Sequence, residues 1–316
     1  MNSDSHLLSQ VEIEPNSSIT PVLSVCICTY RRPDLLVALL NSLARQNFSE
    51  CFETIVVDND PAGGAAEIVE DAKRRHSGLN IRFTIEPRKG ISFARNTAVS
   101  LATGNFVAWI DDDETASENW LSALCATQQA SAADGIFGPV IPVFPEGSPS
   151  WPRRSRIFER PRHQTGTQID AREARTGNAF VKAEWFRTDF PPFDIRLAST
   201  GGEDYDFFAR MEKSGARFEW CDEAEVFELV PRERQRLTWV LERRLRGAVN
   251  YWGGRPASGA WIAARALTGG MMFTVFGIMG ILVAPFGPHY AIRAWSRAIG
   301  GLGRIVALTG VRWNGY

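Results

Sequence analysis

The sequence has few cysteines, and they form no recognisable metal-binding or disulfide pattern. The five are spread along the chain without a CxxC pair or a Cys/His cluster, and their number is odd. Residues 1–20 are polar and lack the basic start and apolar stretch of a secretory signal. We therefore expect no disulfide framework, a reducing cytosolic environment, and a disordered tail at residues 1–20.

Aspartate, glutamate and lysine are absent after Glu242, whereas arginine is frequent there. The formal net charge of −1 therefore hides a basic C-terminal region behind a more acidic one. The arginines of this region are Arg243, Arg244, Arg246, Arg255, Arg265, Arg293, Arg297, Arg304 and Arg312. A basic segment of this kind is typical of proteins that bind nucleic acid or an anionic membrane surface. The neighbouring stretch 271–284 is almost wholly apolar, which favours a membrane and no nucleic acid.

Residues 266–284 are long enough as a helix to approach the ~30 Å hydrocarbon core of a bilayer. Prolines within 285–288 break this stretch. Three arginines beyond the break share one helix face, as in an interfacial amphipathic helix: Arg293, Arg297 and Arg304. Two interpretations stay open. The segment either dips into a membrane as a hairpin, or forms a buried helix pair whose glycines allow close packing.

Short apolar strands alternate with amphipathic helices in the first third of the chain. The expected strands are 22–28, 54–57, 81–85 and 106–110. The expected helices begin at Pro33 and span 65–75 and 91–102. This alternation predicts a doubly wound, mostly parallel α/β sheet of the Rossmann-like type.

The middle of the chain, 139–176, is rich in proline, arginine and serine, and we expect a long irregular loop that serves as a lid or binding segment. Regular structure is expected to return after it. The predicted elements are a strand at 179–182, a helix at 203–214, a strand near 217–221 and a helix at about 232–250.

Polar and charged residues follow each of the first four predicted strands. They are Thr29-Tyr30-Arg31, Asp58-Asn59-Asp60, Glu86-Pro87-Arg88-Lys89 and Asp111-Asp112-Asp113-Glu114. Ligands bind beyond the carboxyl ends of parallel strands, so we expect these groups on one rim. Turn formation and helix capping are structural alternatives for each group taken singly. The three consecutive aspartates would repel one another unless a cation or solvent neutralised them, and their oxygens suit Mg²⁺ or Mn²⁺.

Four segments resemble, in order and spacing, the pattern of glycosyltransferase family 2. They are SVCICTYRRPDLL, TIVVDND, RKGISFARNTAVSLATGNFVAWIDDDE and GGEDYDFFARM. The resemblance covers roughly residues 22–252. The subgroup closest in look is the bacterial exopolysaccharide glucosyltransferases of the succinoglycan type, whose V-P-x-x-R segment resembles residues 230–234.

The resemblance implies a GT-A fold with a nucleotide-sugar glycosyltransferase domain over residues 21–230. A basic helical region, 231–316, would follow it and contain a membrane-associating segment at 266–311. The residues implied to bind the nucleotide-sugar are Thr29, Tyr30, Arg31, Asp58, Gly90, Arg95, Asp111 and Asp112. Among these, Tyr30 would pack on the base, Asp58 would accept a hydrogen bond from its imide nitrogen, and Arg95 would face the nucleotide.

The resemblance also assigns the metal and the catalytic base. Asp113, helped by Asp111 or Asp112, would hold Mg²⁺ or Mn²⁺ on the diphosphate. Asp204 would be the general base, with Glu203 beside it. The alternative from the sequence alone is that these two acids only complement the dipole at a helix start.

The implied activity is the inverting, metal-dependent transfer of one sugar, glucose from UDP-glucose, to a polyisoprenoid-linked saccharide. It would serve bacterial exopolysaccharide or cell-surface polysaccharide synthesis as a peripheral or monotopic protein on the cytoplasmic face of the inner membrane. Thr238 departs from the Q-x-x-R-W motif of processive members, which favours single addition. Glu228 stands in a segment where related enzymes place a histidine, so a third metal contact is unassigned. The alternatives are a nucleotidyltransferase and a catalytically degenerate domain that binds membrane or polysaccharide.

Overall fold

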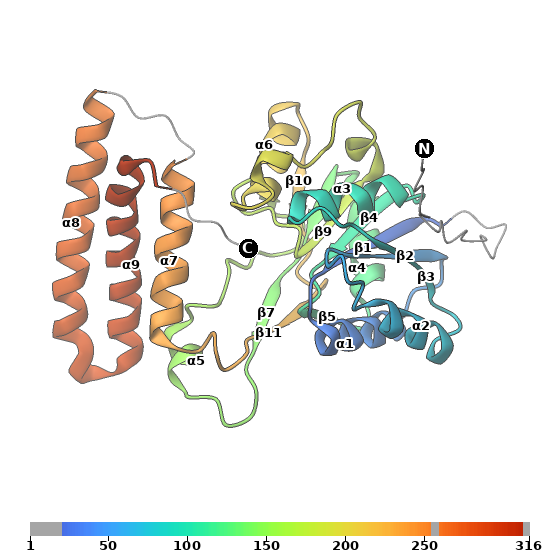
Figure 1. Cartoon of the computed structure of the whole chain (residues 1–316), viewed down its shortest axis with the longest axis horizontal. Coiled ribbons are helices and arrows are strands. Elements are labelled where there is room, and N and C mark those ends of the chain that lie inside the picture. Colours follow the sequence, from blue (N-terminus) through green and yellow to red (C-terminus); the bar gives the residue numbers. More distant parts are fainter. Residues whose placement is uncertain (1–20, 254–258, 312–316) are drawn as a thin grey trace, which may run out of the picture.

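A computed structural model of the chain describes residues 21–253 and 259–311. An α/β part and a layer of three long helices lie next to each other (Figure 1). The expected tail at 1–20, together with Arg255 and Arg312, lies outside the described residues.

Eight strands form the main sheet, in the order β3-β2-β1-β4-β9-β6-β10-β8. Their bounds are β1 (Leu23–Thr29), β2 (Phe52–Asp58), β3 (Asn80–Ile85), β4 (Phe106–Ile110), β6 (Gly135–Phe137), β8 (Gln168–Ile169), β9 (Asn178–Lys182) and β10 (Phe218–Trp220). The first four strands run parallel to one another, and β9 is antiparallel to both β4 and β6. The predicted doubly wound, mostly parallel sheet is confirmed.

Helices cover both faces of this sheet because the strand side chains alternate between two hydrophobic clusters. Leu23, Val25 and Ile27 of β1 face one cluster, whereas Cys26 faces the other. The helices of the first cluster are α1 (Pro33–Leu43), α2 (Ala66–Arg75) and α4 (Trp120–Ser131). Those of the second are α3 (Ile91–Leu101) and α6 (Glu203–Lys213).

A small second sheet has the order β5-β11-β7. Its strands are β5 (Glu114–Ala116), β7 (Val140–Val143) and β11 (Val226–Leu229). The prediction that residues 139–176 form an irregular loop is wrong in part, because this segment contains β7, α5 (Trp151–Ser155) and β8. These elements are too short to show a periodic pattern. They exist because β7 pairs with the distant β11, and α5 packs on the C-terminal helices.

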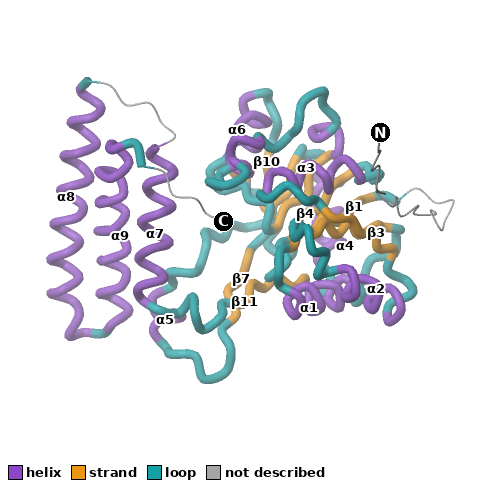
Figure 2. Tube along the Cα trace, in the orientation of Figure 1, coloured by secondary structure: helices purple, strands orange, loops and turns teal. Residues whose placement is uncertain are grey.

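Three helices complete the described chain: α7 (Leu237–Gly253), α8 (Ala260–Val283) and α9 (Pro288–Val306). The central helix of this layer is α9, which contacts both α7 and α8 (Figure 2). The expected break at the prolines is the turn of the α8–α9 hairpin, where a short 3₁₀ helix spans Ala284–Phe286. By length and composition, the helical stretch Ala260–Phe286 is long and apolar enough to cross a membrane. Its apolar 18-residue segment has a mean hydropathy of 2.0, and only 11% of that segment is buried.

The arginines expected on one face of α9 contact other parts of the protein. Arg293 donates to the Ser155 carbonyl at 2.5 Å, and Arg304 lies over the Trp252 ring at 4.9 Å. Arg297 lies over the Phe276 ring at 5.5 Å. Helix α9 is thus packed within the layer, and the exposed apolar surface belongs to α8.

Candidate active site

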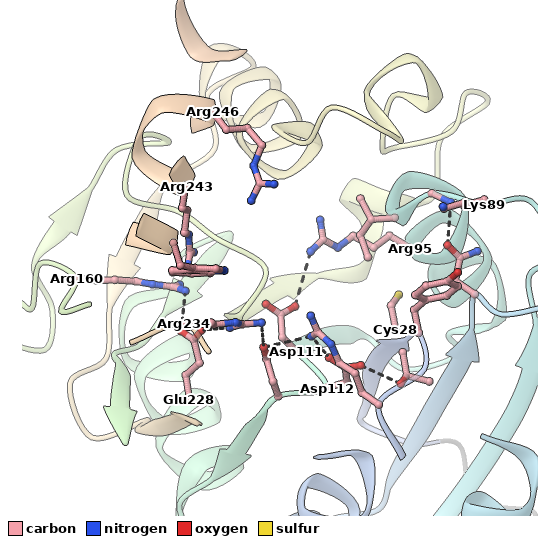
Figure 3. A pocket seen from close by; sticks show the side chains of 18 residues that line it. Cys28, Lys89, Arg95, Asp111, Asp112, Arg160, Glu228, Arg234, Arg243 and Arg246 are labelled. Carbon is pink, nitrogen blue, oxygen red and sulfur yellow. Dashed lines mark hydrogen bonds and ion pairs between the residues drawn. The ribbon is translucent and has the colours of Figure 1, made fainter. Parts of the chain in front are cut away.

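A cavity of about 420 Å³ lies at the carboxyl ends of β1 and β4 (Figure 3). Residues that are far apart in the sequence line it. They are Cys28, Thr29, Tyr30, Arg32, Asn59, Lys89, Gly90, Ile91, Arg95, Asp111, Asp112, Asp113, Arg160, Glu228, Arg234, Trp239, Arg243 and Arg246. The set combines carboxylates, seven basic side chains and two aromatic rings, which suits a polyanionic ligand with an aromatic part.

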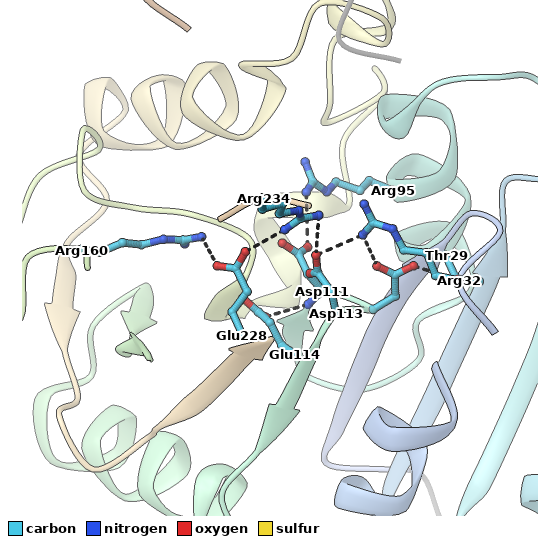
Figure 4. Close-up of polar contacts among 10 residues, drawn as sticks. Thr29, Arg32, Arg95, Asp111, Asp113, Glu114, Arg160, Glu228 and Arg234 are labelled. Atoms are coloured by element: carbon cyan, nitrogen blue, oxygen red, sulfur yellow. Dashed lines mark hydrogen bonds and ion pairs between the residues drawn. The ribbon is translucent and has the colours of Figure 1, made fainter. Parts of the chain in front are cut away.

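Hydrogen bonds fix the second and third aspartates after β4 (Figure 4). The Asp112 carboxylate accepts from the Thr29 hydroxyl at 2.9 Å and from Arg32 at 2.8 Å. Asp113 Oδ2 accepts from Arg32 at 3.2 Å and from Arg234 at 3.1 Å. Two guanidinium groups therefore share the negative charge at the end of β4.

The second sheet brings distant residues to Asp113. The Leu229 amide at the end of β11 donates to the Asp113 carbonyl at 3.2 Å. Glu228 on the same strand pairs with Arg234 at 3.2 Å and with Arg160 at 3.4 Å. These residues form a chain of alternating charge from Asp113 to the segment before β8 (Figure 4).

Asp111 is the aspartate with the least compensated charge. Its side chain is 45% exposed, and its nearest cation is Arg95, with 3.8 Å between Arg95 Nη2 and Asp111 Oδ1. Desolvation raises the pKa of Asp111 to about 6, with Asp113 and Asp112 adding to the rise and Arg95 opposing it. Burial also raises the pKa of Asp112. The cluster therefore holds negative charge that an added cation would stabilise.

Glu114 lies directly beneath this cluster. One of its oxygens accepts from the Asp111 amide at 2.9 Å, and the other has no hydrogen-bond partner among the described residues. Burial and the Asp111 charge raise the pKa of Glu114 well above its usual range. Gly177 leaves room for it, since a Cβ there would lie 2.9 Å from Glu114 Oε1.

The carboxylates fit a hard divalent ion that only one or two protein side chains coordinate. Among the described residues, no group of three or more His, Cys, Asp or Glu side chains is placed to hold a metal by itself. Magnesium-type sites commonly use one or two carboxylates and complete their coordination with substrate phosphates and water. Asp111 and Asp113 supply two such carboxylates to one cavity, so the donor set fits Mg²⁺ or Mn²⁺ bound together with a phosphate ligand.

Helix α3 begins at the cavity wall. Gly90 precedes it with φ 135°, and a Cβ there would lie 2.7 Å from the Ala198 Cβ, so a side chain would be strained and crowded. One turn further, the buried Arg95 forms an ion pair with Glu203 at the start of α6. Burial opposes the charged form of Arg95, but Glu203 and Asp111 raise its pKa above the ordinary value, so it stays charged. Asp204 follows Glu203 in the first turn of α6.

Asp58 lies below the cavity surface. It is 1% exposed, and its two oxygens accept backbone hydrogen bonds from Asp60 and Ala65, each at 2.9 Å. Asn59 lines the cavity instead, and its side chain joins the Glu86 and Arg88 carbonyls to the Gly90 amide. Turn formation, the structural alternative considered for Asp58-Asn59-Asp60, is therefore one role of these residues.

The fold brings together most of the predicted site residues. Those that line the cavity are Thr29, Tyr30, Gly90, Arg95, Asp111, Asp112 and Asp113. Those that do not line it are Arg31, Asp58, Glu203 and Asp204. Arg31 is paired with Asp60 at 2.7 Å and is largely exposed. Glu203 reaches the cavity only through Arg95.

Sequence reasoning missed the basic and aromatic wall that faces the aspartates. Arg160, Arg243, Arg246 and Trp239 come from the segment before β8 and from α7 (Figure 3). Trp239 belongs to the segment compared with the Q-x-x-R-W motif, and Arg243 and Arg246 belong to the basic C-terminal region, but the sequence does not show that α7 reaches the cavity. Arg234 carried a signal, since it ends the V-P-x-x-R segment that the resemblance had singled out.

Comparisons with known proteins agree with this geometry. The profile of the family described as "Glycosyl transferase family 2" matches residues 24–190, a segment that ends before Glu203 and Asp204. The chain is 36% identical over 237 residues to the succinoglycan biosynthesis protein ExoM of Rhizobium meliloti, which covers 73% of this chain and 74% of that protein. It is 28% identical over 187 residues to glycosyltransferase AglE of Haloferax volcanii, covering 58% of this chain and 60% of that protein.

Solved structures with the same fold include two transferases. A mannosyltransferase from Pyrobaculum calidifontis, in complex with GDP-Man and Mn²⁺, has a TM-score of 0.62 at 17% identity and covers 93% of this chain and 90% of that one. Residues 1–349 of TarS from S. aureus, in complex with UDP, have a TM-score of 0.53 at 20% identity, with 92% of each chain covered. The GT-A type of the α/β fold expected from the sequence is thereby confirmed.

Proposed function

Because the chain belongs to glycosyltransferase family 2 and is a glycosyltransferase, we propose that it is an inverting enzyme that moves one sugar from a UDP-sugar to a lipid-linked saccharide. The observation that carries this proposal is the convergence of the Asp111, Asp112 and Asp113 carboxylates with a basic wall around one cavity. A similarity to a succinoglycan biosynthesis protein supports a place in exopolysaccharide or cell-surface polysaccharide synthesis. Glucose is the proposed sugar, as the resemblance of the sequence implies.

The nucleotide part of the donor is proposed to bind at the ends of β1 and β2. Tyr30 lines the cavity there and packs on the base. A hydrogen bond from the imide nitrogen to Asp58 is also proposed; it requires the Asp58 carboxylate, which is 1% exposed, to become accessible when the donor binds. Its two backbone hydrogen bonds leave lone pairs for this contact, since a carboxylate has about four acceptor positions. Thr29, Arg31 and Gly90 belong to the same binding loops, and Arg95 faces the diphosphate.

The diphosphate is proposed to bind where Arg32 and Arg234 now meet Asp113. Asp113 and Asp111 would hold Mg²⁺ or Mn²⁺, with Asp112 fixed behind them by Thr29. The bound ion would stabilise the negative charge on the departing nucleoside diphosphate. Arg32 and Arg234 can turn from Asp113 to the phosphates, because a guanidinium recognises either anion with the same geometry.

Asp204 is the proposed general base. It takes the proton from the acceptor hydroxyl as that oxygen attacks the anomeric carbon, whose bond to the diphosphate breaks in the same displacement. Glu203 holds Arg95 in place. One displacement inverts the configuration, so an α-linked donor gives a β-glycoside.

The cytosolic face of an anionic membrane is the proposed location. Nucleotide sugars are cytosolic, and the exposed apolar side of α8 supports a peripheral or monotopic attachment by the α8–α9 hairpin. Arginines lie on both flanks of α8. They favour a hairpin that enters and leaves the membrane on the cytosolic side, because a full crossing would place the arginines of one flank on the opposite side. A polyisoprenoid-linked acceptor would be presented at this surface.

Calorimetry of UDP binding with and without Mn²⁺ tests the donor and metal assignments. We expect Mn²⁺ to tighten UDP binding to the full chain, and Asp113→Ala to remove this gain because it deletes a metal ligand. Asp34→Ala, which changes an acidic residue at the start of α1 outside the cavity, is the matched control. Equal UDP affinity in the wild type and in Asp113→Ala, with Mn²⁺ present, would contradict the metal site.

A further inference from the structure

A second cavity, of about 530 Å³, opens beside the first between α7, α9 and the segment that follows α5. Four residues line both cavities: Arg160, Glu228, Trp239 and Arg243. The residues that line only the second are Ile157, Phe158, Glu159, Arg175, Val240, Arg244, Gly247, Ala248 and Ser296. A ligand in the second cavity would therefore be separated from the aspartates by side chains that both cavities share.

The second cavity has an excess of positive charge that the protein does not neutralise. Both of its carboxylates are already paired, Glu159 with Arg156 at 2.5 Å and Glu228 with Arg160 and Arg234. Its remaining cations, Arg175, Arg243 and Arg244, make no ion pair with any of the residues that the structure describes. Three guanidinium groups thus face one cavity without a protein counter-ion.

Arg243 lines both cavities and lies among other cations. Desolvation lowers its pKa, and the neighbouring Arg234 and Arg160 charges lower it further, while Glu228 opposes them. Its side chain nevertheless stays accessible to solvent through the cavities. A cation placed in this way gains stability when an anion binds next to it.

The walls hold these arginines in position. Arg243 lies over the Trp239 ring at 5.2 Å, and that ring stacks with Phe158 at 6.4 Å between centroids. On the opposite side, a Cβ on Gly300 of α9 would lie 3.3 Å from Arg244 Nε, so this glycine leaves space for the guanidinium. The basic site is therefore built into the contact between α7 and α9.

The location of the cavity restricts its ligand. Ser296 places one wall on α9, which packs directly against the exposed apolar helix α8. The other end adjoins the catalytic cavity at Trp239. The first cavity, the basic second cavity and the apolar helix α8 therefore follow one another. A molecule with a saccharide at one end, an anionic group in the middle and a lipid at the other end would match these three surfaces in that order.

We propose that the second cavity binds the phosphate or diphosphate group of the lipid-linked acceptor. The assignment rests on the proposed function, in which the acceptor is lipid-linked, and it adds the residues that recognise the acceptor: Arg175, Arg243 and Arg244. The saccharide then extends past Trp239 toward Asp111, and the lipid extends along the α8–α9 hairpin.

Binding of farnesyl diphosphate to the full-length protein in detergent tests this site. UDP and Mn²⁺ are first added to saturation so that the donor cavity is filled. Arg175→Gln and Arg244→Gln, which line only the second cavity and lie on different walls, should each weaken farnesyl diphosphate binding by about tenfold, the loss expected for one charge-assisted hydrogen bond. UDP affinity should stay unchanged in both variants.

Arg236→Gln is the matched control, since Arg236 is exposed, lies just before α7 and lines neither cavity. Circular dichroism and thermal unfolding establish that each variant is folded. If Arg244→Gln fails to fold because α7 and α9 separate, Arg175→Gln decides, since Arg175 lies outside the helical layer.

Two results would overturn the site. Unchanged farnesyl diphosphate affinity in the folded variants would exclude these arginines as its ligands. Inorganic pyrophosphate that binds as tightly as farnesyl diphosphate, and loses as much affinity in the variants, would make this a free-anion site. Failure of the wild type to bind UDP would instead contradict the proposed function, and titration without UDP would still test the second cavity.

Discussion

Asp204 is the residue on which the proposed chemistry depends most. It lies in the first turn of α6 next to Glu203, whose carboxylate forms an ion pair with Arg95. We predict that Asp204→Asn lowers the transfer rate by about 10²–10⁴-fold, as expected for loss of a general base, while UDP affinity stays nearly unchanged. Transfer assays and calorimetry on the same preparation measure the two effects.

The matched variant for this prediction is Glu203→Gln. It should weaken donor binding and stability through Arg95, because it leaves a buried guanidinium without its carboxylate. If Asp204→Asn remains active while Glu203→Gln is correctly folded, binds UDP normally and cannot transfer, the two roles are exchanged.

Glu86 gives a prediction about pH. It is 4% exposed and joins the end of β3 to α3, accepting hydrogen bonds from Arg88 at 2.8 Å and Thr97 at 2.6 Å. The Arg88 hydrogen bond is the main cause that lowers the pKa of Glu86 from 4.5 to about 2. Its folded-state pKa is thus below the unfolded one, so its stabilisation is present above pH 4.5 and is lost as the pH falls toward 2.

We therefore expect Glu86→Gln to lower the Tm by a few degrees at neutral pH, with a difference from the wild type that shrinks under acid. Thermal unfolding followed by circular dichroism over this pH range measures it. Glu67→Gln is the control, because Glu67 is exposed and makes no ion pair with the described residues. A Tm difference that is the same at acid and neutral pH would exclude a charge-dependent role for Glu86.

At the scale of elements, the helical hairpin depends on two glycines that face each other. A Cβ on Gly301 of α9 would lie 2.6 Å from the Gly269 carbonyl oxygen of α8, and one on Gly269 would lie 2.8 Å from the Gly301 carbonyl oxygen. Both contacts involve backbone atoms, which cannot move without separating the helices.

We predict that Gly301→Leu destabilises the α8–α9 pair by about 1–3 kcal/mol or more, the usual cost of overpacking. Gly270→Leu is the control, because a Cβ on Gly270 would meet nothing within 4 Å. Limited proteolysis of the full chain in detergent, quantified by mass spectrometry, measures cleavage in the hairpin. Equal cleavage of both variants would show that this glycine contact does not hold the helices together.

The elements that the sequence predicted correctly are those with a long local pattern. Strands β1 to β4 and helices α1 to α3 alternate regularly, and the polar residues after β1 and β4 were expected on one rim for that reason. The three strands of the second sheet have three or four residues each and are formed by pairing across the chain, so no local window contains their signal. Glu228 was noted only for its departure from a histidine, and the arginines of α7 were assigned to a membrane-binding region, because the sequence does not show that these residues reach the cavity.

At the scale of the whole molecule, the cavity that the three aspartates line and the apolar helix α8 lie on opposite sides of α7 and α9 (Figure 1). The outer surface of α8 exposes large apolar side chains, and the five most exposed are Trp261, Leu267, Met271, Ile281 and Leu282. Contiguous exposed apolar surfaces are typical of contacts with membranes or other proteins. Under the proposed function, this surface attaches the enzyme to the membrane that carries its acceptor.

We predict that replacing these five residues together by serine moves the protein from the bound to the free fraction in sedimentation with anionic phospholipid vesicles at low salt. The apolar burial that holds the helix in the interface would be lost. Phe190→Ser with Ile195→Ser is the control, since both residues are exposed and apolar but belong to the α/β part. Wild-type protein that stays in the supernatant with these vesicles would contradict membrane attachment through α8.

The central claim is that the carboxylates after β4 and at the start of α6 serve one sugar transfer from a nucleotide sugar to a membrane-borne acceptor. Incubation of the full-length protein and acceptor-containing membranes with labelled UDP-sugars and Mn²⁺ tests it directly. We expect one labelled sugar to enter the lipid fraction for each UDP released, and Asp113→Ala and Asp204→Asn each to lower both by about 10²-fold or more. Release of pyrophosphate in place of UDP, or transfer that persists in both variants, would contradict it.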